Sequence, residues 1–202
     1  MKLNAQELRT ADEADVQAQA AALPRQPIYL ILENIYDTYN IGGLFRLADA
    51  LAVSKIYICG QSEIPPNPKI KKASIGTYKI VPWAYFSSVA EAIADIKASC
   101  NLKLETQNGE AKKIHATCYK LQVIAIEQAQ TSLPYTQITY SSPVALILGN
   151  ETYGVLPETL ALADNIAEIP MWGINKSLNV IVSAAIVSYH VIQAFSLAIE
   201  TK

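Results

Sequence analysis

Three short polar segments interrupt a largely apolar sequence, and their residue types suit ligand binding or catalysis. The first has the sequence NIGGLFR at positions 40–46. A glycine pair between a strand and a helix lets the backbone approach a ligand and presents amide donors at the helix start. The alternative is an ordinary tight turn, which the glycines taken alone favour. Arg46 is one of three arginines in the chain. It either serves a site or pairs with Asp49, three residues further on.

The second segment, LGNETYG at positions 148–154, ends an apolar run. Polar residues at the carboxyl end of a buried strand lie where open α/β sheets bind ligands, so Asn150 and Glu151 are candidate site residues. The alternative is a Gly-Asn turn whose carboxylate caps a helix.

The third segment, IPMWGINKSLN at positions 169–179, precedes a long uncharged stretch. Ser177 is a candidate N-cap for the helix predicted there. Asn179 lies among the first residues of that apolar helix and needs a hydrogen-bond partner if buried, which a ligand or Glu151 would supply.

Composition limits the classes of function. The chain has 202 residues, 51% apolar and 17% charged, with a formal net charge of −2. These values predict one globular domain and exclude a disordered chain. The net charge argues against indiscriminate nucleic-acid coating but allows an enzyme with a local basic face. Three cysteines without a C-x-x-C pair and two histidines disfavour disulfides, zinc and a His-based triad, and they fit a reducing cytoplasm.

Apolar runs and turn signals alternate along the chain, which predicts an α/β fold with a mostly parallel sheet. The predicted strands are residues 28–32, 53–59, 80–86, 121–126, 144–148 and 166–169. The predicted helices are residues 5–22, 42–51 and 88–99, with two more beginning near Pro157 and Asn179. Residues 33–40 and 61–72 are predicted loops, and residues 100–116 a loop or hairpin insertion. The uncharged stretch between Lys176 and Glu200 is long enough for a membrane helix, but its polar residues favour a buried helix.

Together, the three segments resemble the three motifs of the SpoU/TrmH branch of the SPOUT RNA methyltransferases. The first motif, Asn-x-Gly-x-x-x-Arg, matches Asn40, Gly42 and Arg46. The second, an apolar strand ending in Gly-Asn-Glu, matches residues 149–151. The third, Ile-Pro-Met followed by Ser-Leu-Asn-Val, matches residues 169–171 and 177–180. The resemblance covers residues 28–197, and three motifs in order are far more specific than any one of them.

The resemblance implies a SPOUT-type fold, in which helices flank a mostly parallel sheet and the C-terminus forms a deep trefoil knot. It also implies a homodimer that binds S-adenosylmethionine. Residues 28–202 would form the methyltransferase domain, and residues 1–27 an N-terminal helical arm. The cofactor-binding residues implied by the resemblance are Ile126, Glu127, Leu148, Gly149, Asn150, Ile169, Met171, Ser177 and Leu178.

The acceptor in this branch is usually a ribose 2′-hydroxyl of tRNA or rRNA, and we expect tRNA. The catalytic residues implied by the resemblance are Arg46, Asn40, Glu151, Ser177 and Asn179. A guanidinium with a pKa above about 12 is a poor base. We therefore expect Arg46 to bind a substrate phosphate and to stabilise the developing alkoxide. Neither a metal nor a membrane is expected to take part.

Five lysines and one glutamate lie between positions 55 and 80, so this region is locally basic. We expect Lys69, Lys71 and Lys72, together with Arg46, to bind RNA, whereas the simpler alternative is a solvated loop face. Two other functions remain open. A non-catalytic RNA-binding relative would keep the fold but lose the site, and an unrelated small-molecule α/β enzyme would need its own acid–base or nucleophilic residues.

Overall fold

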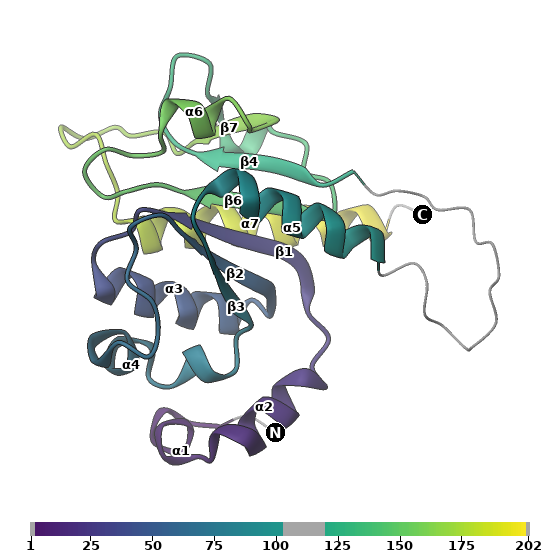
Figure 1. The fold of residues 1–202 in the computed structure, drawn as a ribbon. Helices are drawn as coiled ribbons and strands as arrows, with labels where there is room; N and C mark the ends of the chain where they lie inside the picture. Colours follow the sequence, from purple (N-terminus) through teal and green to yellow (C-terminus); the bar gives the residue numbers. More distant parts are fainter. Residues whose placement is uncertain (1–2, 103–119, 201–202) are drawn as a thin grey trace.

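The computed structural model describes residues 3–102 and 120–200, and its centre is a seven-stranded sheet (Figure 1). The strand order is β3-β2-β1-β6-β4-β7-β5, and each neighbouring pair is parallel. The strands are β1 (Gln26–Glu33), β2 (Val53–Cys59), β3 (Trp83–Phe86), β4 (Gln122–Ile126), β5 (Leu133–Pro134), β6 (Val144–Leu148) and β7 (Asn165–Glu168). The parallel α/β sheet expected from the alternating pattern is thus confirmed.

Helices cover both faces of the sheet. One face packs against α3 (Thr38–Ala50), α4 (Pro68–Ser74) and α7 (Val180–Glu200), and the other against α5 (Val89–Leu102) and the short α6 (Pro157–Leu160). Alternate residues of β1 serve the two cores: Leu30 and Leu32 face α3 and α7, whereas Tyr29 and Ile31 face α5. Because both faces of the sheet centre are buried, the central strands β1, β4 and β6 contain continuous apolar runs. Among the described residues, no helix is long and apolar enough to cross a membrane.

The N-terminal segment forms two helices, α1 (Ala5–Thr10) and α2 (Glu13–Ala21), so the single helix expected over residues 5–22 is wrong. The break has a local cause: the Asp12 side chain accepts hydrogen bonds from Ala14 N and Asp15 N and starts a new helix. Figure 1 shows both helices beside the helix-covered body rather than within the sheet.

Two expectations about loops are also corrected. Helix α3 begins at Thr38 with Asp37 as N-cap, so the predicted loop is shorter and the glycine pair lies inside the helix rather than at its start. The predicted loop 61–72 contains the start of α4, because Asn67 caps the helix and Pro68 occupies its first turn.

The remaining differences between the predicted and the observed elements are smaller. Residues 77–79 form the 3₁₀ helix η1, so β3 begins at Trp83 rather than at residue 80. A second 3₁₀ helix, η2 (Tyr135–Gln137), follows β5. Most of the predicted insertion at residues 100–116 lies outside the described residues. Because all neighbouring strands are parallel, their carboxyl ends meet at one edge, where the second and third motif segments follow β6 and β7.

Candidate functional site

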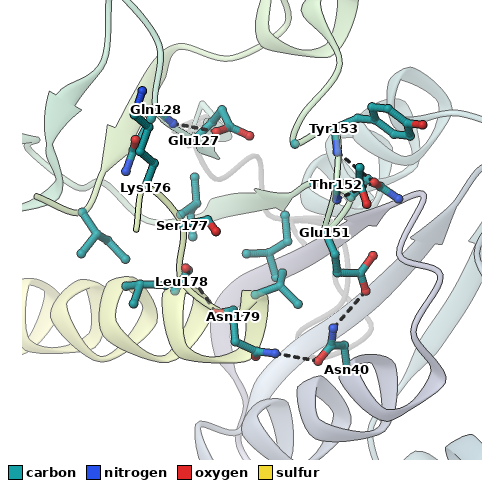
Figure 2. A pocket seen from close by; sticks show the side chains of 18 of the residues that line it. Asn40, Glu127, Gln128, Glu151, Thr152, Tyr153, Lys176, Ser177, Leu178 and Asn179 are labelled. Carbon is teal, nitrogen blue, oxygen red and sulfur yellow. Dashed lines mark hydrogen bonds between the residues drawn. The ribbon is translucent and has the colours of Figure 1, made fainter. Parts of the chain in front are cut away.

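A cavity of about 710 Å³ lies at the carboxyl edge of β4, β6 and β7 (Figure 2). Its walls are the ends of these strands, the loop at residues 149–154, the segment at residues 169–180 and the start of α3. The volume is in the range of small-molecule sites. Every residue expected to bind cofactor lines this cavity: Ile126, Glu127, Leu148, Gly149, Asn150, Ile169, Met171, Ser177 and Leu178.

A chain of hydrogen bonds joins the three motif segments at the side of the cavity (Figure 2). Asn179 Nδ2 donates to Asn40 Oδ1 at 3.0 Å, and Asn40 Nδ2 donates to Glu151 Oε1 at 3.0 Å. Asn40 is buried, so both of its side-chain contacts satisfy a group that would otherwise be costly to bury. The direct partner of Asn179 is therefore Asn40 rather than the expected Glu151, which Asn179 reaches only through Asn40.

Glu151 also anchors the beginning of α3. Its carboxylate accepts hydrogen bonds from Asp37 N at 3.2 Å and Tyr36 N at 3.3 Å. A negative charge at a helix N-terminus is favourable because the backbone N–H groups there carry partial positive charge. The structural alternative considered for this residue, a helix-capping carboxylate, is thus present together with the polar chain to Asn40.

The loop after β6 is closed by its own hydrogen bonds. Asn150 and Gly154 exchange backbone bonds of 3.0 and 2.9 Å. Asn150 Oδ1 accepts from Thr152 N at 2.8 Å and from Tyr153 N at 3.0 Å, and its amide donates to Asn34 O at 2.7 Å. Gly149 is needed at the base, because a Cβ there would lie 2.3 Å from the backbone carbon of Gly154. The Asn150 side chain therefore holds the shape of the loop.

The segment before α7 is much more exposed. Residues 172–179 are all exposed, with Trp172 at 93% and Ile174 at 101% of full accessibility. The N-cap expected at Ser177 is wrong. Helix α7 begins at Val180, and Asn179 Oδ1 accepts from Ile181 N at 2.9 Å, so Asn179 occupies the capping position. Ser177 instead donates to Asn175 Oδ1 from both its backbone N and its hydroxyl.

Arg46 does not line the cavity of its own chain. It is exposed on α3, and Asp49, its alternative partner, interacts electrostatically with Arg25. Burial raises the pKa of Asp49, and the positive charge of Arg25 partly opposes that rise. Gly43 faces Ile181 across the contact between α3 and α7, since a Cβ at Gly43 would lie 2.3 Å from Ile181 Cδ1. One turn later, Arg46 follows on this side of α3.

The lysines expected to bind RNA also lie outside the cavity. Lys69, Lys71 and Lys72 are exposed on α4. Helix α4 packs directly on α3, where a Cβ at Gly42 would lie 2.4 Å from Ala73 Cβ. The structure therefore places these lysines one helix away from the polar chain.

Comparison with known sequences identifies the family. The sequence profile of the SpoU rRNA Methylase family matches residues 27–189. The chain belongs to this family.

Named relatives of this SpoU chain include methyltransferases of tRNA and of 23S rRNA. It is 26% identical over 166 residues to the tRNA (guanosine(18)-2'-O)-methyltransferase of Escherichia coli K12, covering 82% of this chain and 63% of that protein. The SpoU chain therefore spans just under two thirds of the length of that relative.

Solved structures share the fold. An AdoMet-bound rRNA methyltransferase from Sinorhizobium meliloti is 25% identical, with a TM-score of 0.67 and coverage of 86% of this chain and 59% of that one. The A. aeolicus TrmH/SpoU tRNA modifying enzyme is 20% identical, with a TM-score of 0.69 and coverage of 96% and 83%.

Sequence reasoning missed one buried carboxylate that holds the chain just after the loop at residues 149–154. Glu33, the last residue of β1, is buried and accepts hydrogen bonds from Leu156 N at 3.0 Å and from the Thr159 hydroxyl. Glu127 acts in the same way and accepts from Val155 N at 2.8 Å. The signal available in the sequence is an acidic residue directly after an apolar run, although the predicted loop at residues 33–40 includes Glu33.

Proposed function

We propose that this SpoU chain is an S-adenosylmethionine-dependent RNA methyltransferase that methylates a ribose 2′-hydroxyl, in tRNA rather than rRNA. The hydrogen-bond chain Asn179–Asn40–Glu151 beside the cavity carries the proposal, because it joins all three motifs at one place. The choice of tRNA is supported by the named activity of the E. coli relative. The reducing cytoplasm expected from the cysteines is part of the same proposal.

The cavity suits S-adenosylmethionine. Apolar walls from Ile126, Leu148 and Leu178 can enclose an adenine ring. Glu127 contributes a carboxylate that can attract the ammonium or ribose hydroxyls of a ligand, although Val155 N and Gln128 N already donate to its two oxygens. The neighbour from S. meliloti is described as AdoMet-bound. When bound, the cofactor supplies a methyl group on an activated sulfonium centre.

The protein residues must then position the acceptor. Glu151 and Asn179 fix Asn40 from two sides, so the polar edge of the cavity is formed before any substrate arrives. Arg46, on the same helix, would bind a phosphate beside the acceptor ribose and stabilise negative charge on its 2′-oxygen. Ser177 lines the same cavity and would help to orient the ribose.

The homodimer and the trefoil knot belong to this proposal as well. Exposed apolar side chains between residues 172 and 189 support a dimer surface beside the site, and they include Trp172, Ile174, Leu178, Val182 and Tyr189. Apolar patches of this kind mark interaction surfaces in proteins. The knot would involve the segment before α7, and the match of the family profile to residues 27–189 supports it. That match also supports the division into an N-terminal arm and a methyltransferase domain.

Calorimetry with S-adenosylmethionine and its demethylated product tests the cofactor. We expect binding, and an absence of binding at millimolar concentration would refute the proposal. Transfer of labelled methyl from the cofactor to tRNA tests the activity. Mapping the ribose methylations that disappear from RNA of a deletion strain would identify the nucleotide, and their survival in tRNA would refute the choice of substrate.

A further inference from the structure

A second, smaller cavity lies between the N-terminal segment and the helix-covered face of the sheet. Its volume is about 310 Å³. Four of its lining side chains are cationic and none is acidic: the lining residues are Arg9, Pro68, Lys71, Lys72, Gly76, Tyr78 and Lys79. Arg9 comes from α1, whereas Lys71 and Lys72 come from α4 and Lys79 from η1. Segments distant in the sequence therefore bring positive charge to one place.

The N-terminal segment is seated on η1 by specific contacts. Leu8 is buried, and Gly76 has a φ of +94°, with a Cβ there 2.9 Å from the Leu8 carbonyl oxygen. A side chain at Gly76 would therefore push α1 away. Lys79 Nζ donates to Ala11 O at 3.3 Å, which uses one of the three N–H donors of its ammonium. These contacts fix the helix that carries Arg9.

The neighbouring carboxylates do not neutralise this cavity. Glu7 accepts from Asn4 N at 2.7 Å and closes a capping box, and Asp12 accepts from Ala14 N at 2.9 Å at the start of α2. Across residues 3–102 and 120–200, the recorded ion pairs are Lys55–Asp95 and Lys120–Asp164, so the four cations of the cavity have no carboxylate within 4.0 Å. Uncompensated cations lining a concave surface attract anions.

We infer that this basic cavity binds the phosphodiester backbone of the substrate RNA, with Arg9 and Lys79 completing a site begun by Lys71 and Lys72. The inference rests on the proposed function, because it concerns where the same RNA lies. Helix α4, which lines the basic cavity, packs on α3, which carries Asn40 and Arg46, so the two sites are built on neighbouring helices. A nucleic-acid strand can contact both, whereas a single small anion cannot.

The assignment alters the basic face expected from the sequence. Lys69 does not line the cavity, whereas Arg9 and Lys79 do. It also gives the N-terminal segment a function: this segment supplies a cation that would extend the RNA contact beyond the site of methyl transfer.

Binding of unfractionated bacterial tRNA, measured over a series of KCl concentrations, tests the inference. The variants are Arg9→Gln and Lys72→Gln, and the matched control is Lys97→Gln, because Lys97 is exposed on α5 at the other face of the sheet. Each loss of a phosphate contact should lower the slope of log affinity against log salt by about 0.7 to 0.9. We expect roughly three- to tenfold weaker binding at low salt, with the control unchanged and cofactor affinity the same in all variants.

Arg9→Lys separates charge from structure, since it keeps the cation and should restore most of the slope. Wild-type slopes in both glutamine variants would overturn the inference while leaving the proposed function intact. So would equal losses in Arg9→Lys and Arg9→Gln, or displacement of tRNA by inorganic phosphate at equal concentration. Failure of the unaltered protein to bind any tRNA would instead refute the proposed function, and the inference with it.

Discussion

The two loops that line the main cavity are built in opposite ways. Residues 149–155 form a closed loop, in which Asn150 alone makes two backbone and three side-chain hydrogen bonds. Residues 172–178 form an open segment that is exposed throughout. Within the described part of the chain, the recorded hydrogen bonds of the open segment run from Ser177 to Asn175 and stay inside it.

This difference separates two tasks within one site. The closed loop holds Glu151 against Asn40, and a prearranged polar group costs no reorganisation when charge develops in the reaction. The open segment instead presents Trp172 and Ile174 to solvent. Large exposed apolar side chains contribute nothing to the stability of the single chain. We therefore expect a ligand or a second copy of the chain to cover this wall of the cavity. The chain alone thus prearranges the polar half of the site.

Alanine at two glycines gives the strongest test of the contrast. At Gly149 the new Cβ would lie 2.3 Å from Val155 N and 2.6 Å from Gly154 O, both backbone atoms, so the closed loop must shift. We expect Gly149→Ala to lower the free energy of unfolding by about 3 kcal/mol and to abolish cofactor binding. At Gly173 nothing lies within 4 Å, so Gly173→Ala should behave as wild type. Thermal unfolding measures the stability of the two variants, and calorimetry measures their cofactor binding. Equal effects of the two substitutions would show that the two loops are not built differently.

Arg46→Ala should give the next largest effect, on turnover alone. Loss of a donor that acts in the transition state reduces rates by about 10²- to 10³-fold. Since Arg46 lies outside the cavity lining, cofactor affinity should hardly change. Single-turnover methylation and cofactor titration measure the two quantities separately. Wild-type turnover would remove Arg46 from the mechanism, and a parallel loss of cofactor affinity would place it in the cofactor site.

The strands are largely predictable because both faces of the sheet are buried. Strand β6 coincides with the predicted residues 144–148, a continuous apolar run ended by a glycine. Helix boundaries are harder to predict. The glycines at 42 and 43 lower helix propensity, yet they lie inside α3, because close packing on Ala73 and Ile181 outweighs their local cost. Three prolines likewise suggest a loop before Lys72, although Pro68 is compatible with the first turn of α4.

The candidate site also has a part that the sequence predicts and a part that it does not. The motif residues converge because parallel strands end at one edge, so Glu151 and Asn179 can be placed from the sequence. The position of Arg46 outside the cavity cannot be predicted from the sequence, because it depends on how α3 packs against α7. The role of Glu33 is equally hidden, because its partners Leu156 and Thr159 lie more than a hundred residues away.

Glu151→Ala tests whether the closed loop acts through α3. The variant removes the acceptor of Asn40 Nδ2 and of two backbone N–H groups at the helix start. We expect a loss of about 1 to 2 kcal/mol in unfolding free energy, as for a lost helix cap, and about 10- to 100-fold slower turnover from misplaced groups. Thr152→Ala is the matched control, because Thr152 is the next residue and is also exposed. If both variants keep wild-type turnover, the polar chain does not position the acceptor.

The smallest effect on the single chain is expected from the open segment. Trp172 and Ile174 are 93% and 101% exposed, so replacing them by Ala and Ser removes almost no buried contact. The free energy of unfolding at high dilution should therefore change by less than about 0.5 kcal/mol. If this surface completes the site in a dimer, the double variant should form a weaker dimer than the wild type. It should then become monomeric at protein concentrations where the wild type is still dimeric, and lose activity in proportion to the monomer formed. Sedimentation and activity measured over one dilution series separate these effects. An unchanged dimer would exclude the open segment from the dimer interface and leave cofactor binding as its role. A large loss of monomer stability would show that the open segment packs against the body of the protein.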